Sequence, residues 1–354
     1  MRWSLGRGQT PIGVDVGARH IKAMQLSCRG GNRHVEAAAF FPRPGPIDRI
    51  DASTIHELPD VLYRRGFKGN DIVLAAPGDL LRTSILELPG DGPDTPLHQI
   101  ARVEMSRMHK LNPQSFEMAC WVLPEPDRSH KTTHMMAAAC PHEDANRLLD
   151  VLEAQGLSVC ALDVGARALA RANAAITRPG DHIVAILDLG WQVARLVVMN
   201  GQVISYERTL AEGGLGPIHR DLTAQLNDDS EVAEHVLHKV GLTAPQQDAE
   251  QAAASHASVR RVMAEHFEAM LNELLTSLSY MSQQYSQTEL DSVLLVGAGA
   301  SVPGLAEYLE TMLGAKVRSV SPADLVDCPP SLLETCRNPA MTLAMGLALF
   351  SDRK

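Results

Sequence analysis

The stretches IGVDVG at residues 12–17 and IVAILDLG at residues 183–190 decide the fold of this 354-residue chain. Each is a short apolar run that ends in an Asp-x-Gly turn, first Asp15-Val16-Gly17 and later Asp188-Leu189-Gly190. A short apolar run that stops at turn residues is typical of a buried strand. Because the two stretches begin about 170 residues apart, the sequence predicts an internal duplication.

The residues after the first turn predict a βββαβ unit. Apolar runs at 21–26 and 35–41 complete a three-strand meander with the opening strand. A helix with Thr54 as its N-cap follows, and a short buried strand covers 72–76.

The same order of elements follows the second turn. Runs at 193–199 and 203–206 flank an Asn200-Gly201 hairpin turn, which is a strong signal for two antiparallel strands. A helix is predicted at about 217–226 and a closing strand at 292–296. Two related α/β lobes that face each other are therefore expected.

A segment between the two copies has its own pattern of elements. It contains a predicted helix at 97–111 and strands at 118–123 and 135–139, which indicates an inserted α/β subdomain. The expected division of the chain is 1–81 for the first lobe, 82–154 for the insertion, 155–181 for the return to the first lobe, 182–338 for the second lobe with a helical insertion at about 228–288, and 339–354 for a closing helix against the first lobe.

Composition excludes several classes of protein. The net charge of −10 disfavours nucleic-acid binding, because the chain would repel a polyanion. None of the six cysteines forms a C-x-x-C pair, so zinc ribbons and redox pairs are not indicated. The sequence shows no secretory signal and no apolar stretch of about 18 residues, which predicts a cytoplasmic protein without direct membrane insertion.

The paired Asp-x-Gly turns predict a phosphate site. Backbone N–H groups beside a glycine let a phosphate approach the main chain, and a nearby aspartate can hold Mg²⁺ through water. One such turn is common for local reasons alone. Two turns at matched places of a duplicated unit, the first followed by Lys22, favour a nucleotide cleft between the lobes.

At these residues the chain resembles the actin-like ATPase superfamily, and within it the PilM family of type IV pilus assembly proteins. Residues 12–17 with Lys22 look like the first phosphate loop of that family, and 187–190 look like its second. Residues 296–299 with 303–305 are similar to its adenosine loop, and 338–350 to its closing helix. The resemblance implies an actin-like fold of duplicated ribonuclease H-like lobes with an inserted α/β subdomain.

The resemblance also implies a function and a set of site residues. It implies a cytoplasmic adaptor of a type IV pilus or type II secretion platform that binds ATP and Mg²⁺. This adaptor docks the cytoplasmic tail of a PilN-like bitopic inner-membrane protein, contacts other platform proteins, and reaches the inner membrane only through its partner. The implied nucleotide-binding residues are Asp15, Gly17, Lys22, Asp188, Gly190, Glu234, Gly297 and Gly299, with Asp15 and Asp188 orienting Mg²⁺ through water.

Several residues depart from the family pattern. Arg19 stands where small polar residues are usual after the first turn, and Trp191 follows the second turn where a small residue is usual. Leu237 occupies the place of an expected lysine three residues after Glu234, and Ala298 replaces one glycine of a Gly-Gly pair. These changes predict an ATPase that is weak at most.

Two alternatives remain open at this point. A sugar or acetate kinase of the same superfold would use the same cleft, although no motif pairs a catalytic carboxylate with a phosphate acceptor. A polymerising FtsA-like protein would end in an amphipathic membrane-binding tail, whereas the last four residues here, SDRK, follow the closing helix directly. The adaptor hypothesis is therefore preferred over the kinase and the polymerising protein.

Overall fold

A computed structural model describes seven stretches of the chain. They are residues 8–90, 95–124, 132–177, 183–226, 229–242, 250–285 and 289–351. No helix among these residues is both long and apolar enough to cross a lipid bilayer.

The first sheet has five strands in the order β3-β2-β1-β4-β8. Its strands are β1 (Ile12–Val16), β2 (His20–Arg29), β3 (Asn32–Pro42), β4 (Asp71–Ala75) and β8 (Ser158–Asp163). Strands β1, β2 and β3 form an antiparallel meander, and β4 and β8 extend it in parallel. The predicted meander and the following buried strand are thus present.

The second sheet repeats this topology in the order β11-β10-β9-β12-β13. Its strands are β9 (Ile183–Leu189), β10 (Ala194–Asn200), β11 (Val203–Leu210), β12 (Leu290–Val296) and β13 (Lys316–Ser319). Again three antiparallel strands are followed by two parallel ones. The two sheets match strand for strand, which is the duplication that the Asp-x-Gly turns predict.

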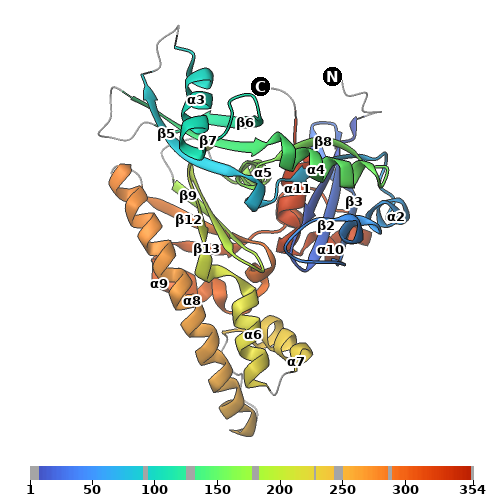
Figure 1. Cartoon of the computed structure of the whole chain (residues 1–354). Helices are drawn as coiled ribbons and strands as arrows, with labels where there is room; N and C mark the ends of the chain where they lie inside the picture. The colour runs from blue at the N-terminus through green and yellow to red at the C-terminus, as the bar shows by residue number, and fades with distance from the viewer. Residues whose placement is uncertain are drawn as a thin grey trace.

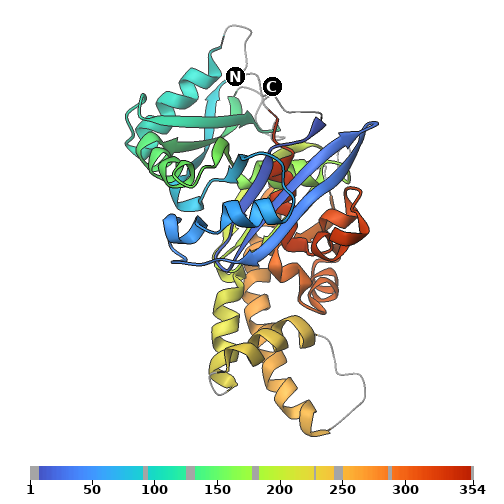
Figure 2. The same cartoon turned by 90° about the vertical axis from the view of Figure 1, so that its right-hand side faces the viewer.

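Two helices lie between the sheets (Figures 1 and 2). Helix α5 (Gly165–Asn173) packs on the second sheet, and α11 (Thr342–Ala348) packs on the first. Ala168 of α5 and Leu347 of α11 meet in one buried cluster. The closing helix therefore completes the core of the first lobe and also joins it to the second.

The inserted segment contains a three-stranded sheet in the order β5-β7-β6. It is formed by β5 (Arg82–Pro89), β6 (Phe116–Val122) and β7 (Thr132–Pro141), with α3 (Leu97–His109) on one face. Helix α4 (His142–Glu153) buries Leu148 and Leu152 in the core of the first sheet instead. The division into domains expected from the sequence stays a prediction, but this packing places α4 with the first lobe.

A group of helices in the second lobe packs on the second sheet and extends beyond it (Figures 1 and 2). They are α6 (Leu215–Gln225), α7 (Ser230–His235), a π-helical turn at Val236–Val240, and the 35-residue α8 (Glu250–Gln284). Met263, Phe267, Met270 and Leu274 of α8 are buried in the core of this lobe, as their helical spacing predicts. The other α-helices of the described residues are α1 (Ala52–Ile55), α2 (Leu58–Arg64), α9 (Leu305–Leu313) and α10 (Leu333–Cys336).

Two local predictions differ from the structure. Asp51, not Thr54, is the N-cap of α1, and Thr54 is the third helical residue of a capping box. The β10–β11 hairpin pairs Asn200 with Val203, so its turn residues are Gly201 and Gln202. In both cases the turn chemistry was recognised and its position was wrong by one to three residues.

Candidate functional site

The first turn is built by β1 and β2 of the first sheet. Asp15 and Lys22 are cross-strand partners, so their side chains leave the sheet on the same face. The Lys22 Nζ lies 2.5 Å from the Asp15 Oδ2, and both side chains are largely buried. The Gly17 N–H donates to the His20 carbonyl oxygen at 3.0 Å and closes the turn. An ammonium group therefore lies directly beneath the predicted phosphate loop.

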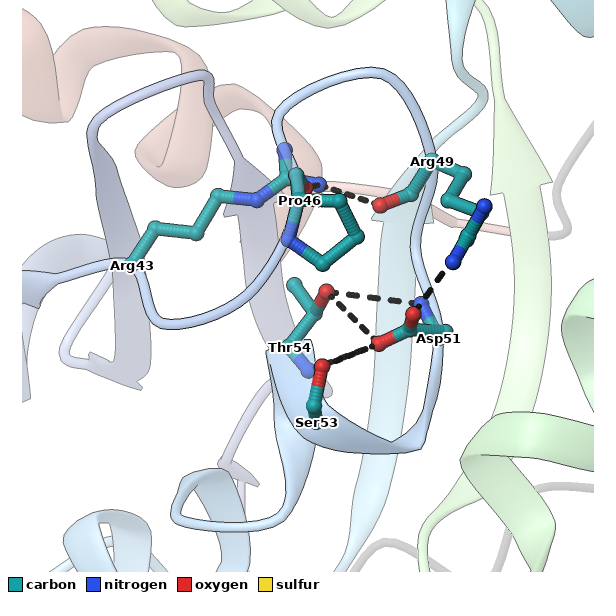
Figure 3. A network of polar contacts seen from close by, with 6 residues as sticks. All are labelled: Arg43, Pro46, Arg49, Asp51, Ser53 and Thr54. Atoms are coloured by element: carbon teal, nitrogen blue, oxygen red, sulfur yellow. Dashed lines mark hydrogen bonds and ion pairs between the residues drawn. The ribbon is translucent and has the colours of Figure 1, made fainter.

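Arg43 fixes the shape of this turn from the adjoining loop. Its Nη1 donates to the Gly17 carbonyl oxygen at 3.0 Å, and its backbone N–H donates to the Arg19 carbonyl oxygen at 2.8 Å. Its Nη2 donates to the carbonyl oxygens of Pro46 and Arg49 (Figure 3). The sequence gives no signal for this residue, because its contacts depend on how the 43–51 loop folds back.

The second turn follows β9 in the second sheet. Asp188 faces Arg195 across β9 and β10, and burial raises the pKa of Asp188 while Arg195 acts in the opposite direction. The charge of Asp15 raises the pKa of Asp188 further. Gly297 has φ +81°, and a Cβ there would lie 2.4 Å from the Asp188 Oδ1. Only glycine allows this approach.

The two turns line one cavity of about 690 Å³. Seven of the eight residues implied by the resemblance line it: Asp15, Gly17, Lys22, Asp188, Gly190, Glu234 and Gly297. Gly299 does not line the cavity, because the place of its missing Cβ faces the Leu189 and Leu215 side chains inside the second lobe. Close packing explains why residue 299 is a glycine, since a Cβ there would lie 2.6 Å from the Leu189 Cβ.

Residues of both lobes touch at the cavity wall. The Arg19 Nη1 lies 2.5 Å from the Glu234 Oε2, and the Arg19 guanidinium lies 4.4 Å from the centre of the Trp191 ring. His238 donates to Glu234, and this bond together with Arg19 lowers the pKa of Glu234 to about 2. Arg19 of the first lobe and Trp191 of the second thus form a cation–π contact at the wall of the cavity.

Lys239 is a cavity residue that the sequence did not indicate. The π-helical turn at Val236–Val240 adds an extra residue to the turn after Glu234. As a result Leu237 is fully buried in the core and Lys239 lines the cavity. The spacing from Glu234 points to Leu237 only in a regular helix, and the single-turn change of period carries no signature in this sequence.

The site fits a magnesium nucleotide by its size and donor set. A cavity of this volume is typical of small-ligand sites. Lys22 and Lys239 would meet phosphate, and Asp15 and Asp188 would accept hydrogen bonds from the waters of Mg²⁺. The N–H groups of the three turn glycines are already donated to carbonyl oxygens, those of His20, Val193 and Pro339. Among the described residues, no group of three or more His, Cys, Asp or Glu side chains is placed to hold a metal ion by itself. A cation there would relieve the repulsion between the two carboxylates.

Two matched sheets around such a cavity, with two helices between them, define an actin-like protein. The structure is similar to that of a PilM-PilN type IV pilus biogenesis complex, at 22% identity and TM-score 0.75, covering 96% of this chain and 98% of that chain. It is also similar to the ethanolamine utilization protein EutJ from Carboxydothermus hydrogenoformans (16% identity, TM-score 0.55, 98% and 91% covered) and to MreB5 of Spiroplasma citri bound to ADP (12%, 0.54, 96% and 95%). The expected fold is confirmed.

The sequence itself identifies the family. Residues 13–352 match the type IV pilus assembly protein PilM family, which is nearly the whole chain. The chain belongs to this family, as the order of its motifs predicted.

Proposed function

We propose that the chain is a cytoplasmic adaptor of a type IV pilus or type II secretion platform that docks the cytoplasmic tail of a PilN-like bitopic inner-membrane protein. Membership of the PilM family over residues 13–352 is the observation that carries this proposal. The similar solved structure is that of a PilM-PilN complex, which supports the choice of partner. In this proposal the adaptor also contacts other platform proteins and reaches the membrane through its partner.

The inserted sheet offers the docking surface. Helix α3 covers one face, and on the other face Ala138, Ala119 and Trp121 pack in a cluster with α5 and the second sheet. The outer edges of β5 and β6 are open to an extended peptide, since no described strand pairs with them. Ile85 on β5 and Val122 on β6 are 41% and 45% exposed. An added strand would gain main-chain hydrogen bonds and apolar contact there.

Point substitutions at the two edges test this docking mode. We expect Ile85→Asp or Val122→Asp to abolish co-purification with the membrane partner, because a charge would be buried under the added strand. Val203→Asp is the matched control, since Val203 is 43% exposed on β11, the edge strand of the second sheet. If both edge variants retain the partner as the control does, the peptide binds elsewhere.

The cleft is proposed to bind ATP with Mg²⁺ and to turn it over slowly or not at all. Hydrolysis requires a positioned water and stabilised transition-state charge in addition to a phosphate cradle. Arg19, the one arginine in the first turn, is engaged by Glu234 and Trp191, and the small polar residues usual at this turn are missing. The cleft therefore keeps groups that can bind phosphate but has few that could position a water or stabilise transition-state charge.

We expect phosphate release by the purified protein to stay well below the ordinary enzyme rate of about 1 per second. A coupled phosphate assay with saturating Mg-ATP measures it, and the Lys22→Met variant provides the background. Release at ordinary enzyme rates would contradict this expectation and favour a kinase or a motor.

A further inference from the structure

The two departures from a usual phosphate cleft contact each other across it. Arg19 belongs to the β1–β2 turn of the first lobe, and Trp191 follows β9 in the second. The guanidinium lies 4.4 Å from the centre of the Trp191 ring and 2.5 Å from the Glu234 Oε2. Two changes that look like separate losses of phosphate contacts therefore form a single bridge between the lobes.

The second-lobe half of this bridge is held in place by its neighbours. The His238 Nε2 lies 3.3 Å from the Glu234 Oε1, and the His219 Nε2 lies 3.6 Å from its Oε2. The His219 ring also packs on Trp191, with the ring centres 5.1 Å apart. The Gly216 N–H donates to the Trp191 carbonyl oxygen at 2.7 Å, which ties this loop to α6. The Glu234 and Trp191 side chains that Arg19 contacts are therefore held in position by contacts within the second lobe.

We propose that Arg19, Trp191 and Glu234 form a strap that holds the two lobes together in the ligand-free protein. This regulation of the cleft rests on the proposed nucleotide site. A ligand closes a two-lobed protein only by contacts that the closed state has and the open state lacks. Here the chain supplies such a contact itself, so a nucleotide adds little to closure. The consequence is that the closed arrangement of the two lobes does not depend on nucleotide.

Hydrogen exchange of the ligand-free full chain tests the strap. Arg19→Ala should speed exchange in the second-lobe segments 190–193 and 214–216 by about tenfold, because they lose their cover from the opposite lobe. Arg64→Ala is the matched control, since Arg64 makes an exposed pair with Asp60 within α2. A change confined to the first lobe would mean that Arg19 only shapes its own turn, and would overturn the proposal.

Two further exchange measurements distinguish a failure of the strap proposal from a failure of the proposed nucleotide site. At about 1 M salt, where the screening length is about 3 Å, the wild type should approach the exchange of Arg19→Ala, because both charged side chains are about one third exposed. Added Mg-ATP should slow exchange strongly in Arg19→Ala and only slightly in the wild type. An equal, large slowing in both proteins would contradict the strap. If no binding is detected by calorimetry, the nucleotide site fails, while the ligand-free comparison still decides on the strap.

Discussion

Gly346→Ala is expected to lower the free energy of unfolding by about 3 kcal/mol, although alanine is the better helix former. A Cβ at Gly346 of α11 would lie 2.0 Å from the Ala168 carbonyl oxygen and 2.6 Å from its carbonyl carbon in α5. These are backbone atoms of a helix that is itself packed on the second sheet, so no side-chain movement relieves the contact. The two central helices would have to separate.

Urea unfolding measures this effect, and Gly78→Ala is the control. The place of a Cβ at Gly78 has no atom within 4 Å. That variant should therefore stay within about 0.5 kcal/mol of the wild type. If Gly346→Ala is as stable as the wild type, α5 and α11 do not pack as closely as described.

The second large effect is expected for Lys22→Met. This substitution leaves the buried Asp15 without the ammonium that lies 2.5 Å from its Oδ2. Breaking a buried ion pair by removing one partner costs about 3–5 kcal/mol. It also removes the cation placed beneath Gly17, so nucleotide binding should be lost together with stability.

A double substitution separates the two roles of Lys22. Asp15→Asn combined with Lys22→Met removes both charges and should recover most of the lost stability, as seen by thermal unfolding, without recovering nucleotide binding. Lys68→Met, at an exposed lysine of the same lobe, is the control and should change neither property. Nucleotide binding by the double variant at wild-type affinity would show that Lys22 does not contact phosphate.

Much of the fold could be predicted because short local patterns, the apolar runs that end in Asp-x-Gly turns, reveal the duplication. The apolar runs that end at Asp15 and Asp188 are strands of matched sheets, and the topology follows from repeating one unit. The packing of α4 was less predictable, because an amphipathic helix shows that it has a buried face and not which sheet covers it. Its Leu148 and Leu152 lie in the first-lobe core.

The candidate site was predictable where it lies on strands and turns. Asp15, Lys22, Asp188 and Gly297 reach one cavity because strand register brings them there. Lys239 was missed because a π-helical turn changes the helix period, and no local residue type marks such a turn. The partnership of Arg19 with Glu234 joins residues 215 positions apart, which no spacing reveals.

A titration of the partner's cytoplasmic tail peptide against the full chain, and against a chain without the inserted sheet, decides whether that sheet is the docking surface. Arg82 and Ala139 are cross-strand partners, so a two-residue Asn-Gly turn can join them in place of 83–138 and leave α4 intact. Thermal unfolding first verifies that the lobes stay folded. We expect saturable binding to the full chain and binding at least about tenfold weaker to the shortened chain. Equal affinity of the two folded proteins for the peptide would contradict this expectation.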